Sequence, residues 1–368
     1  MDYSERHATL DVQFALGKDC HIISSNINIR FFSFNSTFRP LLLNADDEFI
    51  GENASFVYPV LYPAGKTKSD DAIVLLHGLN ERKWNKYLPW AEYLVKTSGK
   101  PVILFPIAFH MNRSPYAWSN PHEMSYMLNL RRMRNGDDRF LTVANVALSE
   151  RICEQPLRFY VSGKQSIIDL NELVVSIKEG KHPLFNENAQ IDIFAYSIGA
   201  FLSQIALMAD ENGIYSDSKL FMFCGGGVFS SMFGKSRSIL DGKAFDVLLK
   251  YYLDTYPAIL FSTENKDRIS QAFCSMIAPQ WFEKERSSFF ENMGNGLSGI
   301  SLKKDYVMPH SGIVHAMGEK YAASHIQCLD FDYDYSHETP FPLTGKVDIQ
   351  TVNRSFDKVF STAAQFLA

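Results

Sequence analysis

Ser197 is the residue whose surroundings point most directly to chemistry. It lies in Phe194–Ala200 (FAYSIGA), between a short apolar run and an apolar helical pattern from about Ile198 to Met208. A serine at a sharp strand-to-helix turn is exposed for nucleophilic attack, and such a turn needs small residues two positions to either side. Gly199 meets this need, and Ala195 stands where glycine is more usual. The segment therefore predicts a nucleophilic serine.

A second motif lies upstream, where the apolar run Ala72–Leu76 ends in His77-Gly78. Gly78 lets the backbone bend, so that the next amide can face a developing negative charge. We assign the oxyanion hole to the backbone N–H groups of Leu79 and Ile198; losing one such donor typically costs about 3 kcal/mol in the barrier. His77 itself is expected to shape the loop.

The general base should follow the last strand of the chain. Ile326–Tyr333 has the pattern of that strand, and Ser336–Pro340 that of the loop after it. His337 is the last histidine in the sequence and lies in this loop. We therefore predict that His337 is the base that activates Ser197.

An acid must orient the imidazole of His337. Asp305 ends a strand-like run that begins at Leu297, and one further helix (around Ile313 to Tyr321) and one strand separate it from His337. The alternative is Asp267, which follows the strand-like run Ala258–Ser262 but lies too far upstream for a single crossover. We prefer Asp305.

The elements that must position these residues alternate between strands and helices. Short apolar runs are typical of parallel strands that are covered on both faces, and strand–helix–strand order predicts right-handed crossovers. The N-terminal part has strand patterns instead, the second of them typical of an edge strand. The expected parallel strands are Ala72–Leu76, Val102–Ile107, Ile191–Ala195 and Leu220–Cys224, a helical pattern covers Trp84–Leu94, and the N-terminal strands are His21–Phe34 and Phe56–Tyr62.

Residues 1–70 thus form an N-terminal β segment that joins the sheet, and residues 71–368 form the α/β core. Two long stretches, 112–163 and 230–295, interrupt the alternation and are too long for ordinary loops. We expect them to form a helical cap over a pocket; peripheral helices are the alternative for the first. Their expected helices are Glu123–Met133, Thr142–Cys153 and Phe245–Leu253.

Several side chains near strand ends are expected to contact a substrate. His110 and Asn112 follow the second parallel strand, and Tyr196 precedes Ser197. Tyr116 and Trp118 lie in the same stretch as His110, and cap packing is an equal alternative for all but Tyr196.

The chain order Ser197, Asp305, His337, with His-Gly upstream, resembles the α/β-hydrolase superfamily. The resemblance covers Phe56 to the C-terminus, outside the two insertions. It implies a mostly parallel sheet of about eight strands flanked by helices, a lid in the second insertion, and acyl transfer without a cofactor or metal.

From the resemblance and the aromatic content (29 Phe and 17 Tyr) we expect a serine hydrolase that cleaves a small carboxylic ester through an apolar acyl pocket. A thioesterase or a peptidase would use the same three residues. A catalytically silent scaffold of this fold is a further alternative. So is a metal-dependent hydrolase that uses Asp330, Asp332, Asp334 and His337.

Composition narrows the partners. The net charge of −5 gives no reason to expect nucleic acid or an anionic membrane. The five cysteines are far apart and have no metal-ligand spacing. The first residues lack an apolar run behind a basic start, so we expect no signal peptide and a cytoplasmic location. The sequence does not indicate an oligomeric state.

Overall fold

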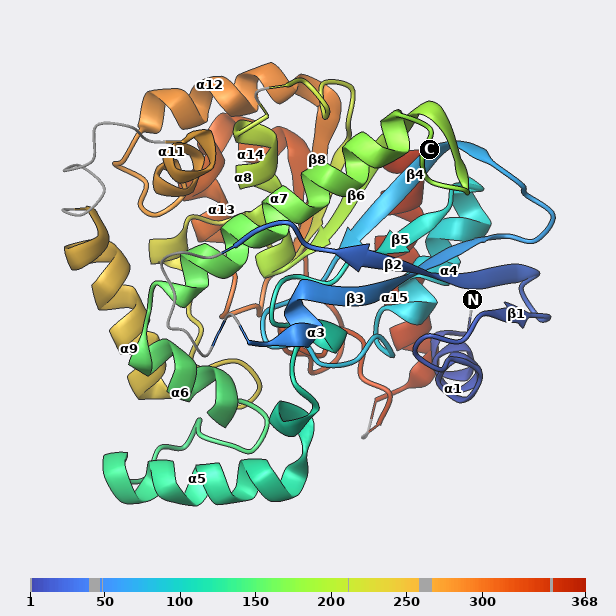
Figure 1. The fold of residues 1–368 in the computed structure, drawn as a ribbon. Helices are drawn as coiled ribbons and strands as arrows, with labels where there is room; N and C mark the ends of the chain where they lie inside the picture. The colour runs from blue at the N-terminus through green and yellow to red at the C-terminus, as the bar shows by residue number, and fades with distance from the viewer. Residues whose placement is uncertain (1, 40–46, 48, 211, 258–266, 345–346) are drawn as a thin grey trace.

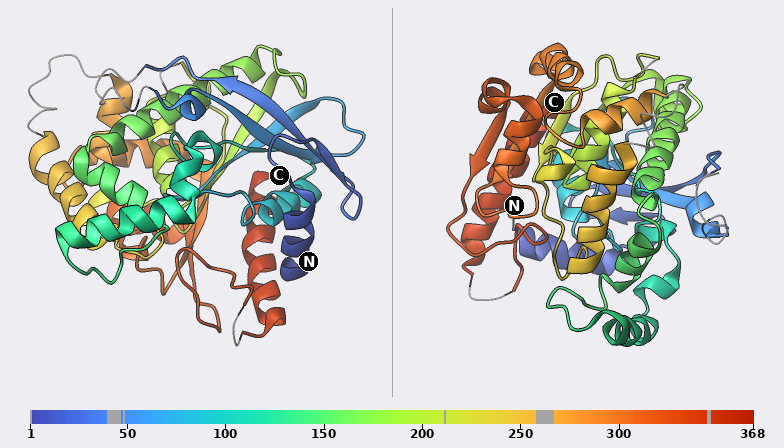
Figure 2. Two further views of the ribbon diagram at one scale, coloured as in Figure 1. Left: turned by 60° about the horizontal axis from the view of Figure 1, so that its bottom comes forward. Right: turned by 90° about the vertical axis from the view of Figure 1, so that its left-hand side faces the viewer.

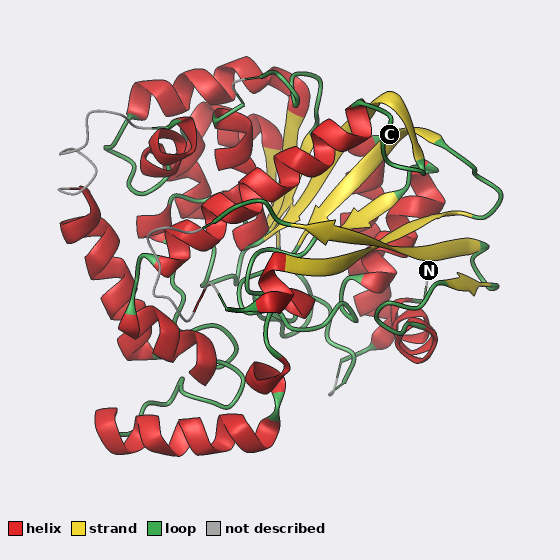
Figure 3. Cartoon of the chain, in the orientation of Figure 1, coloured by secondary structure: helices red, strands yellow, loops and turns green. Residues whose placement is uncertain are grey.

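The computed structural model describes residues 2–39, 47, 49–210, 212–257, 267–344 and 347–368. A twisted sheet runs through the middle of the molecule, and helices cover both of its faces (Figures 1 and 3). The described residues form a nine-stranded sheet in the order β1-β2-β3-β5-β4-β6-β7-β8-β9. The predicted mostly parallel α/β sheet is confirmed, with nine strands where about eight were expected.

Strands β4 to β9 are parallel to one another, whereas β1, β2 and β3 are antiparallel to their neighbours, including β3 to β5. The prediction of an edge strand at Phe56–Tyr62 is wrong, because β3 pairs with β2 on one side and with β5 on the other. Its Pro59 is opposite Phe31 of β2 and lies just before the pairing with β5, which covers Val60 and Leu61. The strands are β1 (Cys20–Ile22), β2 (Ile27–Asn35), β3 (Ser55–Pro63), β4 (Ser69–Leu76), β5 (Val102–Leu104), β6 (Phe185–Tyr196), β7 (Leu220–Phe223), β8 (Leu297–Leu302) and β9 (Ile326–Leu329).

Three other predicted strands differ in extent. The segment His21–Phe34 is a hairpin, because a turn separates β1 from β2. Of the predicted run Val102–Ile107, only Val102–Leu104 forms a strand. The last predicted strand ends at Leu329 instead of Tyr333. The run Ala258–Ser262 lies outside the described residues.

The helices follow the predicted alternation, but several were not predicted, among them α1 at the N-terminus, the short α3 and the long α7. One helix was predicted around Ile313 to Tyr321, and two short helices, α13 and α14, lie there. The helices are α1 (Tyr3–Gln13), α3 (Gly51–Ala54), α4 (Leu88–Ser98), α5 (Pro121–Asn135), α6 (Val146–Glu154), α7 (Arg158–Lys178), α8 (Ile198–Met208), α9 (Gly242–Lys250), α11 (Arg268–Ser275), α12 (Glu283–Met293), α13 (His310–Met317), α14 (Glu319–His325) and α15 (Ile349–Leu367). A π-helical turn, Tyr251–Thr255, extends α9, and short 3-10 turns lie at Met111–Arg113, Tyr116–Ser119, Phe229–Ser231 and Gly294–Gly296.

The alternation of side chains along the strands divides the core into two layers. Val74 and Ile193 face the layer that contains α7, α8 and α11, whereas Leu75 and Phe194 face the layer that contains α1, α4 and α15. The left view of Figure 2 shows α1 and α15 together on one side of the sheet. Because both faces are buried, the central strands read as continuous apolar runs.

Helix α6 from the first long interruption packs against α5 of the same interruption and against α9 of the second (Figure 1). A buried ion pair between Arg131 of α5 and Asp241, the N-cap residue of α9, joins the two segments. Helix α7 starts at Arg158 and packs against β6. It therefore covers the sheet, although the predicted first interruption extended to residue 163.

Among the described residues, no helix combines the length and the apolar character needed to cross a membrane.

Candidate active site

Ser197 lies at the junction of β6 and α8, with a φ of 58° and a ψ of −122°. A non-glycine residue in such a sparsely populated region costs about 1–3 kcal/mol and persists only where the surroundings impose it. The Ser197 amide donates to the carbonyl of Phe223 on the neighbouring strand β7, at 3.1 Å. The turn is thus held by the sheet itself.

Two glycines allow this turn to pack. A Cβ on Gly199 would lie 2.7 Å from the Leu76 carbonyl oxygen at the end of β4, and a Cβ on Gly225 would lie 2.6 Å from the Ser197 carbonyl oxygen. Sequence reasoning found Gly199 but missed Gly225. The signal was present in the run Gly225–Gly227 directly after the β7 strand.

The turn brings Ser197 to His337. The Ser197 Oγ lies 2.7 Å from His337 Nε2, and His337 Nδ1 lies 2.7 Å from Asp305 Oδ2. All three side chains are buried. Because a carboxylate can only accept, the proton between His337 and Asp305 belongs on Nδ1, which leaves Nε2 free to accept from the Ser197 hydroxyl.

Asp305 is held on its other side by the loop after β8. Its Oδ1 accepts from the amides of Val307 and Met308, both at 2.9 Å. The Cys224 thiol also donates to Asp305, and burial and this negative charge raise the pKa of Cys224 well above its ordinary value. The other aspartate considered from the sequence, Asp267, caps α11 and pairs with Lys164 at 2.7 Å, apart from His337.

Tyr196 supports His337 directly. Its hydroxyl donates to the His337 carbonyl oxygen, and its ring stacks on the imidazole with the centroids 5.5 Å apart. Burial raises the pKa of Tyr196 well above its ordinary value, so the phenol remains a donor. Tyr196 was predicted to contact the substrate, and it lies in the wall of the cavity next to Ser197.

The loop after β4 is fixed by His77. Its Nδ1 donates to the Gly78 carbonyl oxygen at 2.8 Å, and its Nε2 accepts from the Ile107 amide at 2.9 Å. Burial, with the nearby His110, lowers the pKa of His77 well below its ordinary value, so the ring is neutral. His77 therefore shapes the loop that carries Leu79.

Asn80 ties the same loop to both long interruptions of the sheet. It has a φ of 62°, and its Nδ2 donates to the carbonyl oxygens of Ala144 at 2.8 Å and Ser238 at 2.7 Å. Neighbouring Leu79 lines the cavity that contains Ser197. Ile198 is the first residue of α8, so its amide has no acceptor within its own helix.

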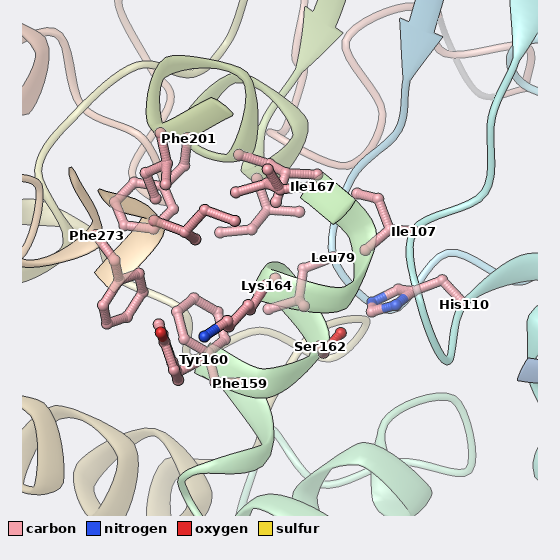
Figure 4. Close-up of a pocket in the computed structure, with 15 residues that line it drawn as sticks. Leu79, Ile107, His110, Phe159, Tyr160, Ser162, Lys164, Ile167, Phe201 and Phe273 are labelled. Atoms are coloured by element: carbon pink, nitrogen blue, oxygen red, sulfur yellow. The ribbon is translucent and has the colours of Figure 1, made fainter. Parts of the chain in front are cut away.

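Three cavities surround Ser197 and share Leu79 as a wall residue. A polar cavity of about 630 Å³ contains Ser197, His337 and Lys86. Two apolar cavities, of about 490 and 400 Å³, begin at Ile198. Figure 4 shows the first of these, with the rings of Phe201 and Phe273 at one end and His110 at the other.

The other residues predicted to contact the substrate lie in different places. His110 lines the 490 Å³ cavity. Asn112 instead donates through Nδ2 to the Val57 carbonyl oxygen at 2.8 Å and accepts from Trp84 Nε1 at 3.4 Å, so its amide braces the loop after β5.

The aspartates of the alternative metal site are not arranged as the sequence predicted. Because β9 ends at Leu329, Asp330, Asp332 and Asp334 follow the strand instead of sharing one of its faces. Asp330 accepts from the Tyr335 hydroxyl at 3.0 Å and lies 3.7 Å from the Lys304 ammonium group. Within the described ranges, no three His, Cys, Asp or Glu side chains are arranged to hold a metal ion.

Comparison with known proteins agrees with this architecture. Residues 41–368 match DUF6051, a family of unknown function. None of the curated protein sequences matches the chain significantly. Among solved structures, a thermostable esterase from Pseudomonas putida is similar in fold, with a TM-score of 0.52 at 10% identity, covering 100% of this chain and 91% of that one.

Carboxyl esterase 2 from the fungus Tuber melanosporum is similar with a TM-score of 0.50 at 8% identity, covering 98% of this chain and 97% of that one. At such low identity the likeness concerns the fold. The chain has the α/β-hydrolase fold and belongs to the family DUF6051.

Proposed function

We propose that the protein is a serine hydrolase that cleaves small carboxylic esters through an acyl-enzyme. The observation that carries this proposal is the chain of two 2.7 Å hydrogen bonds from Ser197 through His337 to Asp305. It starts at a serine held at a positive φ on a strand-to-helix turn. A base within hydrogen-bond reach, itself oriented by a third group, is the arrangement that activates a serine.

In the first half of the reaction, His337 Nε2 takes the proton from Ser197 Oγ as the oxygen attacks the ester carbonyl carbon. The amides of Leu79 and Ile198 then stabilise the oxyanion, and the positive end of α8 adds to this effect. When the tetrahedral intermediate collapses, His337 protonates the leaving alkoxide, and the acyl group remains on Ser197. Asp305 stays ionised and holds the imidazolium in position.

In the second half, His337 removes a proton from water, which attacks the acyl-enzyme carbonyl. The products are the carboxylic acid and the free serine, so the net change is one ester and one water to one acid and one alcohol. Each proton passes through Nε2. Tyr196 keeps the imidazole in position because its hydroxyl donates to the backbone carbonyl oxygen of His337.

The apolar cavities support an ester with a hydrophobic acyl part. The 490 and 400 Å³ cavities meet at Leu79 and Ile198, where the carbonyl would lie, and their walls are largely aliphatic and aromatic. The two solved relatives in fold are described as esterases. We further propose that α5, α6 and α9 form a cap, because Leu148 of α6 and Leu248 of α9 line a cavity that also begins at Leu79.

The test is labelling with a fluorophosphonate, which reacts with an activated serine. We expect wild type to be labelled, Ser197→Ala to be unlabelled, and p-nitrophenyl ester hydrolysis to fall by about 10⁴-fold or more in Ser197→Ala and His337→Ala. Ser301→Ala is the matched control. Ser301 is also buried and its Oγ contacts a histidine, His310, at 2.9 Å, but it lies apart from the Ser197 chain.

The control should retain labelling and turnover. A folded wild type that is neither labelled nor active on any ester would contradict the proposal and favour a silent scaffold.

A further inference from the structure

A fourth cavity, of about 550 Å³, continues from Leu79 and Asn80 toward the first long interruption of the sheet. It differs from the two apolar cavities because Arg82, Arg151 and Arg158 line it. Arg82 lies on the same loop as Leu79, three residues later. The cavity therefore brings cationic side chains close to the proposed oxyanion hole.

The three arginines differ in whether a carboxylate neutralises their charge. Arg151 and Arg158 both pair with Asp47, and Arg158 also pairs with Glu154. For Arg82, the described residues offer no carboxylate within ion-pair distance. Among the described residues, Arg82 is thus the cation of this cavity wall that has no counterion.

The guanidinium of Arg82 is also short of hydrogen-bond acceptors. Nη2 donates to Asn80 Oδ1 at 2.9 Å, whereas Nε and Nη1 are buried and have no acceptor in the described part of the chain. The group lies over the Trp118 ring at 5.5 Å, and Arg151 lies over the same ring at 4.4 Å. A buried cation with unmet donors is costly unless a ligand supplies an acceptor.

The surrounding charges make the need for an anion greater. Burial and the charge of Arg151 lower the pKa of Arg82 to about 10, so Arg82 is still a cation at neutral pH. His110, which also lines this cavity, donates from Nδ1 to the Ala108 carbonyl oxygen, and its buried Nε2 has no partner among the residues that the structure describes. Burial, with the charges of Arg82 and Arg113, lowers the pKa of His110 to about 3. An oxyanion at this point would offset the penalty at Arg82, whereas His110 Nε2, which carries no proton in this tautomer, would not donate to it.

The proposed mechanism indicates which part of the substrate enters this cavity. His337 must protonate the leaving group, and His337 lines only the polar cavity among the four that share Leu79. The leaving group therefore lies in the polar cavity. The acyl part extends in the other direction, past Leu79, toward the apolar cavities and Arg82.

We propose that the acyl part of the substrate carries a carboxylate that binds Arg82, with Arg151 and His110 beside it. The inference rests on the proposed function and narrows its substrate class to half-esters of dicarboxylic acids. The apolar walls at Phe159 and Leu248 fit the methylene chain between the two carboxyl groups. Hydrolysis of such a substrate releases an alcohol and a dicarboxylate.

The test compares p-nitrophenyl half-esters of adipate and suberate with p-nitrophenyl hexanoate and octanoate, which have the same chain lengths without the charge. These chains are long enough to avoid rapid cyclisation. In wild type we expect kcat/KM to be roughly ten- to a hundredfold higher for at least one half-ester than for its neutral counterpart, as expected for a charge-assisted hydrogen bond. Free adipate should inhibit, and hexanoate and inorganic phosphate should inhibit less.

In Arg82→Met the ratio of the two kcat/KM values should fall to about one, and Arg82→Lys should retain part of it. Arg134→Met is the control, because Arg134 is exposed and pairs with Glu150 on the outside of α5 and α6. Its ratio should equal that of wild type. The ratio is measured within one protein, so a general loss of activity does not change it.

A wild type that cleaves the neutral esters but prefers none of the half-esters would overturn the inference and leave the proposed function intact. So would an Arg82→Met variant that loses activity on both substrates equally. If phosphate inhibits more strongly than adipate, the site binds a phosphate group, and the proposal of a carboxylate ligand is wrong. Absence of labelling at Ser197, with no ester cleaved, would instead remove the proposed function.

Discussion

The substitution Gly225→Ala tests whether the turn at Ser197 depends on a backbone contact that leaves no room for a side chain. Gly225 follows β7, and an added Cβ would lie 2.6 Å from the Ser197 carbonyl oxygen and 2.7 Å from the Ala200 Cβ. Its φ lies outside the left-handed region, so alanine is not opposed by the local backbone conformation. The predicted effect therefore comes from overpacking alone.

The size of the effect follows from these distances. Real Cβ contacts almost never fall below 3 Å, so the two backbones must separate by roughly half an ångström. Overpacking of this kind costs about 1–3 kcal/mol of stability. A displacement of about 1 Å in a catalytic group can cost a hundredfold in rate, so we expect Gly225→Ala to react about ten- to a hundredfold more slowly at Ser197.

The assay measures the second-order rate of fluorophosphonate labelling together with unfolding in urea. Gly296→Ala is the matched control, because its added Cβ would be 3.6 Å from the nearest atom, Met293 Cε, an ordinary contact. The control should stay within about 0.5 kcal/mol of wild type and label at the same rate. If Gly225→Ala behaves like the control in both measurements, the contact does not position Ser197 and the reasoning is refuted.

Three other predictions concern stability. Ser197→Gly should be about 1 kcal/mol more stable to urea than Ser197→Ala, because both lose the hydroxyl but only glycine relaxes the positive φ; equal stability would show that the turn is unstrained. Burial lowers the pKa of His182 to about 4, with Nδ1 accepting from the Leu184 amide at 3.2 Å. As the pH falls, His182 in the unfolded chain (pKa about 6.5) therefore takes up its proton before His182 in the folded protein does. The contribution of neutral His182 to the free energy of unfolding is complete above pH 6.5 and falls by about 2 kcal/mol at pH 5. His182→Gln should remove that part of the pH dependence in urea titrations, and an unchanged profile would disprove the assignment. Arg113→Leu should cost about 3–5 kcal/mol by leaving the Asp169 carboxylate, 2.6 Å away and fully buried, without its cation; a double replacement by leucine should recover part of this in the same assay, and a cost below 1 kcal/mol for the single variant would contradict the estimate.

The fold could be predicted from the sequence wherever burial imposes a clear pattern of apolar residues on a strand or helix. The runs at β4, β6 and β7 are apolar because helices cover both faces of the sheet, and their order predicted a parallel arrangement. Prediction failed where neighbours decide the outcome. Nothing in Phe56–Tyr62 reveals that β3 has a partner on each side, because a proline there is compatible with an edge and with this antiparallel pairing.

Ser197 and His337 could be named from the sequence because their context is local. One is a serine between a strand and a helix, and the other is a histidine after a terminal strand. The choice between Asp305 and Asp267 was made from spacing, and the hydrogen bond from His337 to Asp305 is a tertiary fact. Asn112 shows the limit of this reasoning. Its position after a strand end predicted substrate contact, but its side chain instead reaches back to Val57.

By itself, the sequence determined the α/β class, the turn at Ser197 and the chain order of Ser197, Asp305 and His337, because these depend on periodicity and on steric demands within a few residues. Only the tertiary structure decided which groups surround them. Tyr196 supports His337, Gly225 makes room for the turn, and Arg82 has no counterion among the described residues around Leu79. Such relations join residues far apart in the chain, and their energies depend on distance and burial, which no local pattern records.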